Sequence, residues 1–360
     1  MPVQILTFAE AMSASKQVPP EECANKRRLL IGNGHSIGCL DSFRYSALYQ
    51  KITDSGLPAH IQDVFSHFGE SNFEAVLRAL DDGAWMATHY GMINTDTSRN
   101  MLNDYGLVKN YLADAISSVH PINASRIPGR KYEASHSFFS HFDDIYSLNY
   151  DLLAYWTVLS KDPHKFCDGF FRDEDTPLDC CEYMPEKTRG KPRIYWLHGA
   201  LHLYTDGGSV RKRVWEGTGI NLIDQIREAL NRKEYPLFVA EGDSLSKLKK
   251  IEASSYLFDC LDKFSRIQGQ LFIYGHSLPA QDQHILDMIA KNIDLRHLWI
   301  SLHGAAETPS NQNIILAAEK IARHRQSHIG TQPMTGTRGG ITIHYFDSDS
   351  ASVWGDTPAI

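Results

Sequence analysis

Residues 27–46, RRLLIGNGHSIGCLDSFRYS, contain the pattern that decides the fold of this chain. An apolar run leads into Gly32-Asn33-Gly34, and glycines directly after a buried strand let backbone N–H groups approach a phosphate. The same stretch contains G-x-S-x-G at residues 34–38, the nucleophile elbow of serine hydrolases. The two interpretations predict different chemistry, so the place of this stretch in the fold matters.

The serine-hydrolase interpretation conflicts with the position of the motif in the chain. A nucleophile elbow normally follows a central strand late in the sheet, and an earlier strand supplies the oxyanion loop. Here the motif follows the first predicted strand, so no earlier strand can supply that loop. Nucleophilic catalysis by Ser36 is therefore the less favoured alternative.

The dinucleotide fingerprint G-x-G-x-x-G is also incomplete, because the third glycine, Gly38, comes one residue late. Gly32 and Gly34 still permit close approach of the main chain to a pyrophosphate, and Ser36 can add a hydroxyl. We therefore expect a phosphate cradle, with a tight strand-to-helix turn that holds no ligand as the alternative.

The composition is that of an ordinary globular protein, with 42% hydrophobic and 22% charged residues in 360. A net charge of -7 argues against general binding of nucleic acid through bulk charge. None of the six cysteines forms a C-x-x-C pair, so a zinc module of two such pairs is not expected. Without a secretory leader or a run of 18 apolar residues, the sequence predicts a cytoplasmic protein and no membrane partner.

Short apolar runs that end in Gly, Asn, Asp or His recur along the chain, with helical patterns between several of them. Such runs are typical of a buried parallel sheet, whose ligands bind at the carboxyl ends of the strands. The polar residues collect at these ends, in IGNG, SLNYD, WLHG, AEGD, YGHS and SLHG. The predicted strands are residues 28–32, 145–149, 193–199, 235–242, 270–275, 297–303 and 341–346.

About a hundred residues separate the first two predicted strands, far more than a crossover needs. Apolar residues at three- and four-residue spacing predict helices there. We therefore expect an N-terminal extension at 1–26, a helical insertion at 45–140, and one α/β domain built from 27–44 and 141–360. The stretch 161–191, rich in Asp, Glu, Pro and Cys, is expected to be an irregular surface excursion.

Two of the predicted strand ends carry candidate catalytic groups. Asn149 and Asp151 are two residues apart, which places an amide and a carboxylate on the same side of an extended end. A turn or a helix N-cap is the alternative. His198, followed by a glycine, suits a general base, and a structural histidine or a zinc pair with His202 are its alternatives. A metallophosphoesterase is disfavoured, because the first strand lacks Asp-x-His.

Taken in chain order, these motifs resemble the sirtuin fold, and more closely the bacterial sirtuin-like NAD-hydrolases of anti-phage defence. GNGHS is similar to the sirtuin G-A-G-x-S, SLNYD to the Gln-Asn-x-Asp strand end, and LHG to the catalytic His-Gly. The later matches are PLFVAEGD (236–243), YGHSL (274–278) and LWISLHG (298–304).

The chain also departs from sirtuin deacetylases. It lacks their four-cysteine zinc module, which weakens the case for protein deacetylation. Asp41-Ser42-Phe43-Arg44 differs from the Pro-Asp-Phe-Arg flap by an extra serine, so the resemblance assigns no role to Phe43 or Arg44. The large helical insertion instead resembles the defence relatives.

The resemblance implies a Rossmann-like, sirtuin-type parallel sheet and an NAD+ glycohydrolase that releases nicotinamide and ADP-ribose in abortive infection. Asn149 would orient the attacking water, Asp151 would contact the carboxamide or order the loop, and His198 would accept a proton. No metal is expected, and a homo-oligomer or a partner ATPase would gate the activity. A sensor or assembly subunit that binds NAD or ADP-ribose without cleaving it is the alternative. The implied NAD-binding residues are Gly32, Asn33, Gly34, Ser36, Gly275, Ser277 and Ser301.

Overall fold

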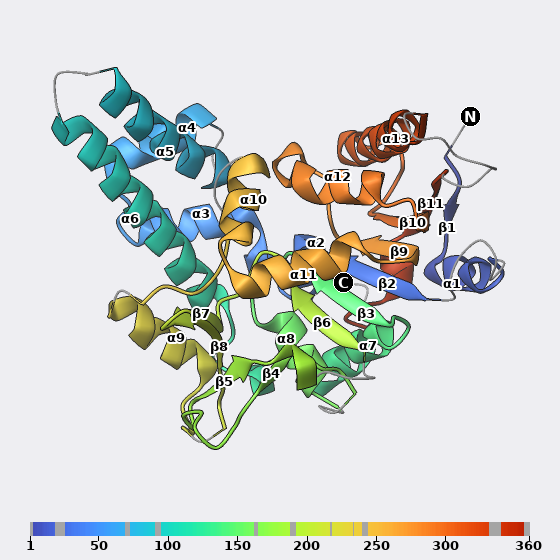
Figure 1. Ribbon diagram of the computed structural model, residues 1–360, viewed down its shortest axis with the longest axis horizontal. Helices are drawn as coiled ribbons and strands as arrows, with labels where there is room; N and C mark the ends of the chain where they lie inside the picture. Colours follow the sequence, from blue (N-terminus) through green and yellow to red (C-terminus); the bar gives the residue numbers. More distant parts are fainter. Residues whose placement is uncertain are drawn as a thin grey trace.

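Seven parallel strands form the central sheet of the protein, in the order β1-β11-β10-β9-β2-β3-β6 (Figure 1). The computed structural model describes residues 3–18, 26–68, 73–90, 95–161, 165–187, 192–216, 218–232, 234–239, 244–330 and 340–355. The strands are β1 (Ile5–Leu6), β2 (Arg27–Ile31), β3 (Asp144–Ser147), β6 (Arg193–Trp196), β9 (Gly269–Tyr274), β10 (Leu295–Leu302) and β11 (Thr342–Asp347).

The strand order reverses between β2 and β9. The chain passes from β2 to β3 and β6 on one side, then returns to β9 beside β2 and continues outward to β10 and β11. This is the doubly wound Rossmann order, so the predicted α/β class with a parallel sheet is confirmed. In such sheets the crevice at the reversal point is where ligands bind.

The predicted strand at 235–242 is wrong for its described part. Residues 234–239 form one isolated bridge, between Phe238 and Gly199, and backbone hydrogen bonds from Leu237 and Val239 to residues 198–203, but no strand of the sheet. AEGD at 240–243 lies outside the described residues. The apolar character of this segment reflects burial against the site rather than a place in the sheet, because Phe238 and Val239 are both buried.

Helices cover both faces of the sheet (Figure 1). Phe8 and Phe138 pack against the strand side chains of one face, with ring centroids 6.4 Å apart for Phe8 and Phe272, and 5.2 Å for Phe138 and Tyr274. Phe264 covers the other face through Tyr146, at 5.0 Å. The first face carries α1 (Phe8–Lys16), α7 (Gly129–Phe139) and α8 (Leu153–Leu159), and the second carries α11 (Ser255–Ser265), α12 (Gln283–Lys291) and α13 (Pro309–Gly330).

The segment predicted to be a helical insertion contains a group of helices beside the carboxyl ends of the strands. Its two longest helices project away from the sheet as an antiparallel pair (Figure 1). The N-terminal extension adds the edge strand β1, which pairs with β11. The helices of the insertion are α3 (Tyr45–Asp54), α4 (Ala59–Phe68), α5 (Phe73–His89) and α6 (Thr95–Val119).

A second, antiparallel sheet lies beside β6, in the order β4-β5-β8-β7. The stretch 161–191 was expected to be irregular, but it supplies two of these strands, and a buried ion pair between Asp168 and Lys212 joins it to the rest. Among the described residues no helix has both the length and the apolar character needed to cross a bilayer. The strands are β4 (Phe170–Phe171), β5 (Cys180–Tyr183), β7 (Leu203–Asp206) and β8 (Ser209–Arg213).

Candidate functional site

A cavity of about 1200 Å³ lies at the carboxyl ends of the parallel strands. Its walls come from the residues that follow β2, β3, β6, β9, β10 and β11, and the helical insertion adds apolar side chains. Typical pockets for small ligands are about 300–1,000 Å³, so this cavity has room for a ligand as long as a dinucleotide. The residues predicted from the sequence that line it are Gly32, Asn33, Gly34, Asn149, Asp151, His198, Gly275, Ser277 and Ser301.

The glycines of the first loop allow two backbones to touch at the reversal point. A Cβ on Gly34 would lie 2.6 Å from the Cα of Gly275, and a Cβ on Gly32 would lie 2.7 Å from the Gly275 carbonyl oxygen. Gly275 itself has a φ of +65°, which side chains rarely adopt. Glycine is therefore required at all three positions by the contact between the β2 and β9 loops.

This contact also occupies two backbone donors. Gly32 donates its N–H to the carbonyl of Tyr274 at 2.9 Å, and Gly34 donates to the carbonyl of Gly275 at 2.8 Å. The expectation that these two N–H groups bind a pyrophosphate is therefore wrong, because both are used to join the loops. The loop still forms a wall of the cavity.

The side chain of Asn33 holds the next segment in place over the cavity. Its Nδ2 donates to the carbonyl of Phe43 at 3.1 Å, within the short helical turn η1 (Asp41–Phe43). Arg44 follows directly and lines the cavity, where it forms an ion pair with Asp41. Among the described residues that line the cavity, Arg44 is the only lysine or arginine.

Ser36 lies behind the cavity wall and has no exposed surface. Its Oγ donates to Oδ2 of Asp151 at 2.5 Å and accepts the side-chain N–H of Asn149 at 2.9 Å. No histidine is among these hydrogen-bond partners, so a nucleophilic role for Ser36 has no support here. The hydroxyl instead links the two residues that follow β3.

This link fixes the orientation of the Asn149 amide. A hydroxyl has one proton, and the proton of Ser36 goes to the carboxylate of Asp151, so Ser36 must accept from Asn149. The nitrogen of the amide therefore faces Ser36, and Oδ1 is the atom left to accept a hydrogen bond in the cavity.

Asp151 is buried and serves two neighbours at once. Burial raises its pKa, and hydrogen bonds from Ser36 and from the backbone N–H of Leu153 oppose that rise. The Leu153 bond, at 2.8 Å to Oδ1, tethers the first turn of α8. The alternative of a turn is thus also realised, in the same side chain, because this bond spans two residues just before α8, whose N-cap is Leu152.

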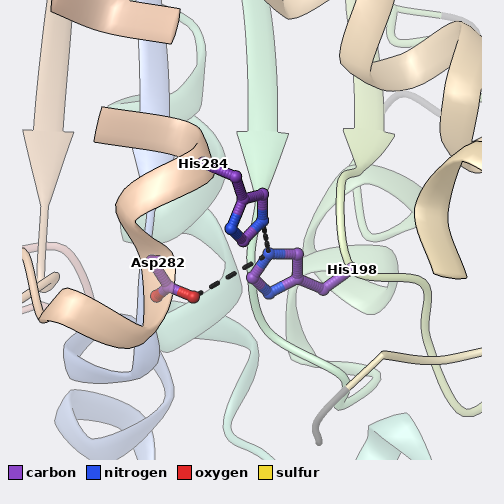
Figure 2. A group of neighbouring side chains, drawn as sticks. All are labelled: His198, Asp282 and His284. Atoms are coloured by element: carbon purple, nitrogen blue, oxygen red, sulfur yellow. Dashed lines mark hydrogen bonds and ion pairs between the residues drawn. The ribbon is translucent and has the colours of Figure 1, made fainter. Parts of the chain in front are cut away.

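His198 lies at the end of β6 with only 2% of its surface exposed. Its Nε2 is 3.1 Å from Nε2 of His284 and 4.0 Å from Oδ1 of Asp282. Figure 2 shows how the three side chains point toward one another. Burial lowers the pKa of His198 well below its ordinary value, while the charge of Asp282 opposes this. The ring is therefore neutral at pH 7, as a general base must be.

Two further residues surround the carboxylate of Asp282. The Lys247 ammonium donates to Oδ1 at 3.0 Å and has no exposed surface, and His276 contacts Oδ2 at 2.9 Å through Nε2. Burial alone would raise the pKa of Asp282, but the hydrogen bond from His276 and the charges around it hold this pKa well below the usual range. Asp282 is consequently a buried anion in the wall of the cavity.

His198, Asp282 and His284 are also close enough to hold a metal ion, since one ligand atom of each lies within 4.8 Å of the others. A cation already balances the carboxylate, however, because Lys247 is 3.0 Å from the oxygen that a metal would use. A second positive charge there would be repelled by this buried lysine. His202, the other candidate zinc ligand, stacks on Tyr155 in the core instead.

The far end of the cavity is polar. Ser301 accepts the backbone N–H of Gly275 at 3.0 Å, while the side chain of Ser277 is exposed to the cavity. Beyond them, Nδ1 of His303 and Oδ1 of Asp349 form a hydrogen bond at 3.0 Å after β10 and β11. Ser301 thus supports the β9 loop as well as lining the cavity.

Asp282, His284 and Lys247 were not predicted from the sequence. They lie in α10 (Ser244–Glu252) and at the start of α12, away from the ends of the predicted strands. The available signal was the pair Asp282 and His284 in PAQDQHIL, which comes directly after YGHSL.

A family model described as a domain of unknown function (DUF4917) matches residues 29–354. No curated protein sequence matches the chain.

Proposed function

The chain belongs to the DUF4917 family, and we propose that it is an NAD+ glycohydrolase. In this proposal NAD+ lies in the cavity at the strand ends, and water cleaves the bond between nicotinamide and ribose. The products are nicotinamide, ADP-ribose and a proton. The observation that carries the proposal is the meeting of Asn149, Asp151 and His198 beside the reversal point of a Rossmann-ordered sheet.

The shape of the cavity supports a dinucleotide. Sheets with this strand order bind dinucleotides across the crevice where the order reverses, and the cavity spans that point from β6 to β11. The catalytic groups are at the β3 and β6 end, so the adenosine half would extend toward Ser277 and Ser301. The pyrophosphate would then cross the contact between the β2 and β9 loops.

A pyrophosphate needs a positive partner, and Arg44 is the candidate. Its guanidinium lines the cavity next to the Gly32–Gly34 loop, and its present partner, Asp41, is mostly exposed. An exposed ion pair of this kind contributes little free energy, so a phosphate can replace it at small cost. Arginine also matches the geometry of phosphate oxygens.

The chemistry follows from the two fixed side chains. Loss of neutral nicotinamide leaves positive charge on the ribose, and a water molecule must attack the anomeric carbon. Oδ1 of Asn149 would accept a hydrogen bond from that water, and neutral His198 would take its proton or that of a ribose hydroxyl. Asp151 would act through Ser36, by holding the Asn149 amide in this orientation.

Such an activity would consume a cofactor that its host needs, so we expect it to be gated. The sirtuin-like resemblance favours self-assembly into a homo-oligomer or activation by a partner ATPase, in the cytoplasm and as part of abortive infection. A subunit that binds NAD+ or ADP-ribose without cleaving it is the second candidate. The Ser36 link favours catalysis over simple binding, because it fixes the orientation of one particular amide.

The test is NAD+ consumption by the purified full chain, with nicotinamide and ADP-ribose both quantified. His198→Ala and Asn149→Ala should each lower turnover by about 100-fold or more while the protein stays folded. His60→Ala, at an exposed histidine on α4, is the matched control and should keep wild-type turnover. Full turnover in either site variant would contradict the proposal. NAD+ binding without turnover would favour the second candidate.

A further inference from the structure

Asp282 lies in the cavity wall on the Nε2 side of His198, between a buried lysine and two histidines. We propose that Asp282 is a positioning residue that holds the ring proton of His198 on Nε2 and leaves the lone pair of Nδ1 free for the reaction. The inference deepens the proposed function, because it names the basic atom. The position of the proton can nevertheless be measured whether or not the protein cleaves NAD+.

Asp282 carries a negative charge that is fixed in place. Leu278 donates its backbone N–H to Nδ1 of His276 at 3.3 Å, so the proton of that ring is on Nε2 and is donated to Asp282. Lys247 donates to the other carboxylate oxygen. Both oxygens therefore accept hydrogen bonds from donors that cannot turn away, and the carboxylate is held in one orientation.

The two histidines, His198 and His284, form a chain of hydrogen bonds. Nε2 of His198 faces Nε2 of His284, so one of the two nitrogens must donate and the other must accept. Nδ1 of His284 faces the hydroxyl of Ser244 at 3.1 Å, and that hydroxyl also accepts the backbone N–H of His284. Burial lowers the pKa of His284 to about 4, so both rings are neutral at pH 7.

These hydrogen bonds alone allow two arrangements. In one, Ser244 donates to His284, which donates to His198 and leaves the His198 proton on Nδ1. In the other, His198 donates from Nε2 to His284, which donates from Nδ1 to Ser244, whose oxygen has two lone pairs. The chain of contacts is satisfied either way, so another group must decide between them.

The negative charge of Asp282 favours one of these two arrangements over the other. Its Oδ1 lies 4.0 Å from Nε2 of His198, and a negative oxygen favours a proton on the nitrogen nearest to it. The other charged or titratable groups that act on this ring are Lys247, His276 and His284. The first two donate to Asp282, and the third supplies the acceptor for the Nε2 proton. The arrangement with Nδ1 as the basic atom is therefore favoured.

The experiment is nitrogen NMR on the full chain labelled with ¹⁵N-histidine, since the ring nitrogen shifts distinguish the two neutral forms. The signals of His198 are identified by their loss in His198→Gln. We expect the wild type to carry the proton on Nε2, and Asp282→Asn to raise the share of the Nδ1–H form at least about tenfold. Asp82→Asn, at an exposed aspartate on α5 that is paired with Arg78, should leave the form unchanged.

Asp282→Glu keeps the charge and should restore the Nε2–H form, which a merely structural role would not predict. A wild-type ring protonated on Nδ1 would overturn the proposal, and so would an Asp282→Asn spectrum equal to that of Asp82→Asn. If Asp282→Asn does not fold, the wild-type and Asp282→Glu spectra decide. If Asp282→Asn moves the His198 proton to Nδ1 but the wild type never cleaves NAD+, the proposed function is refuted and this inference stands.

Discussion

The hydroxyl of Ser36 donates to the carboxylate of Asp151 at 2.5 Å, with no exposed surface on the serine. This bond joins the loop after β2 to the loop after β3, and it decides which way the Asn149 amide faces. A residue that matches a nucleophile motif in the sequence thus has a positioning role in the structure.

Ser36→Ala tests that role. Removing the hydroxyl leaves the Asn149 N–H and one Asp151 oxygen without a partner, so we expect a loss of about 1–3 kcal/mol in the free energy of unfolding. Turnover of NAD+ should fall but stay measurable, because Asn149 and His198 remain. Urea unfolding and an NAD+ assay measure both effects, with Ser137→Ala on the exposed face of α7 as the control. A loss of turnover as complete as in His198→Ala would instead point to Ser36 as a nucleophile.

Gly34→Ala tests the contact between the β2 and β9 loops. Its Cβ would lie 2.6 Å from a backbone atom of Gly275, which cannot move aside as a flexible side chain can. We expect a loss of about 2 kcal/mol or more in the free energy of unfolding and NAD+ binding weakened at least about tenfold.

The matched substitution is Gly106→Ala, within α6, where a Cβ would meet nothing within 4 Å. Alanine is favoured over glycine inside a helix, so this variant should gain about 0.5–1 kcal/mol. Two alanine variants of equal stability would refute the argument from close approach. Calorimetry and NAD+ titration on the same samples make the comparison.

Local pattern was sufficient to predict the strands that carry Asn149, His198 and Gly275, because a buried parallel strand is apolar throughout and ends in polar residues. Local pattern could not predict why residue 34 must be glycine, since the group that excludes a side chain there is Gly275, which is distant in the sequence. The two-residue strand β1 is too short for any periodicity.

The charged residues around His198 could not be predicted from the sequence, for a related reason. Asp282 and Lys247 are charged residues in helices, a pattern that normally indicates a solvent-exposed face. Their burial follows from how α10 and the start of α12 pack against each other beside His198, and that packing depends on contacts between distant segments. A charge hidden by tertiary packing looks like any surface charge in the sequence.

His35 makes stability depend on pH. Its ring lies between Phe139, on which it stacks, and Trp354, which is tilted against it, and burial lowers its pKa from 6.5 to about 3. The unfolded chain therefore takes up a proton below about pH 6.5 that the native state refuses until about pH 3. Stability is lost as pH falls through this window, by about 1.4 kcal/mol per pH unit for one proton.

His35→Phe should remove this one proton from the difference in proton uptake between the unfolded and native states, while keeping an aromatic ring between Phe139 and Trp354. Urea unfolding at about pH 7, 6 and 5 gives the free energy of unfolding at each pH. Between about pH 6 and 5, the slope of this free energy against pH should be smaller than in the wild type by up to about 1.4 kcal/mol per pH unit. His67→Phe, at an exposed histidine on α4, is the control and should leave the slope unchanged. Equal slopes for His35→Phe and the wild type would mean that the native state admits a proton at His35, which its packing between the two rings excludes.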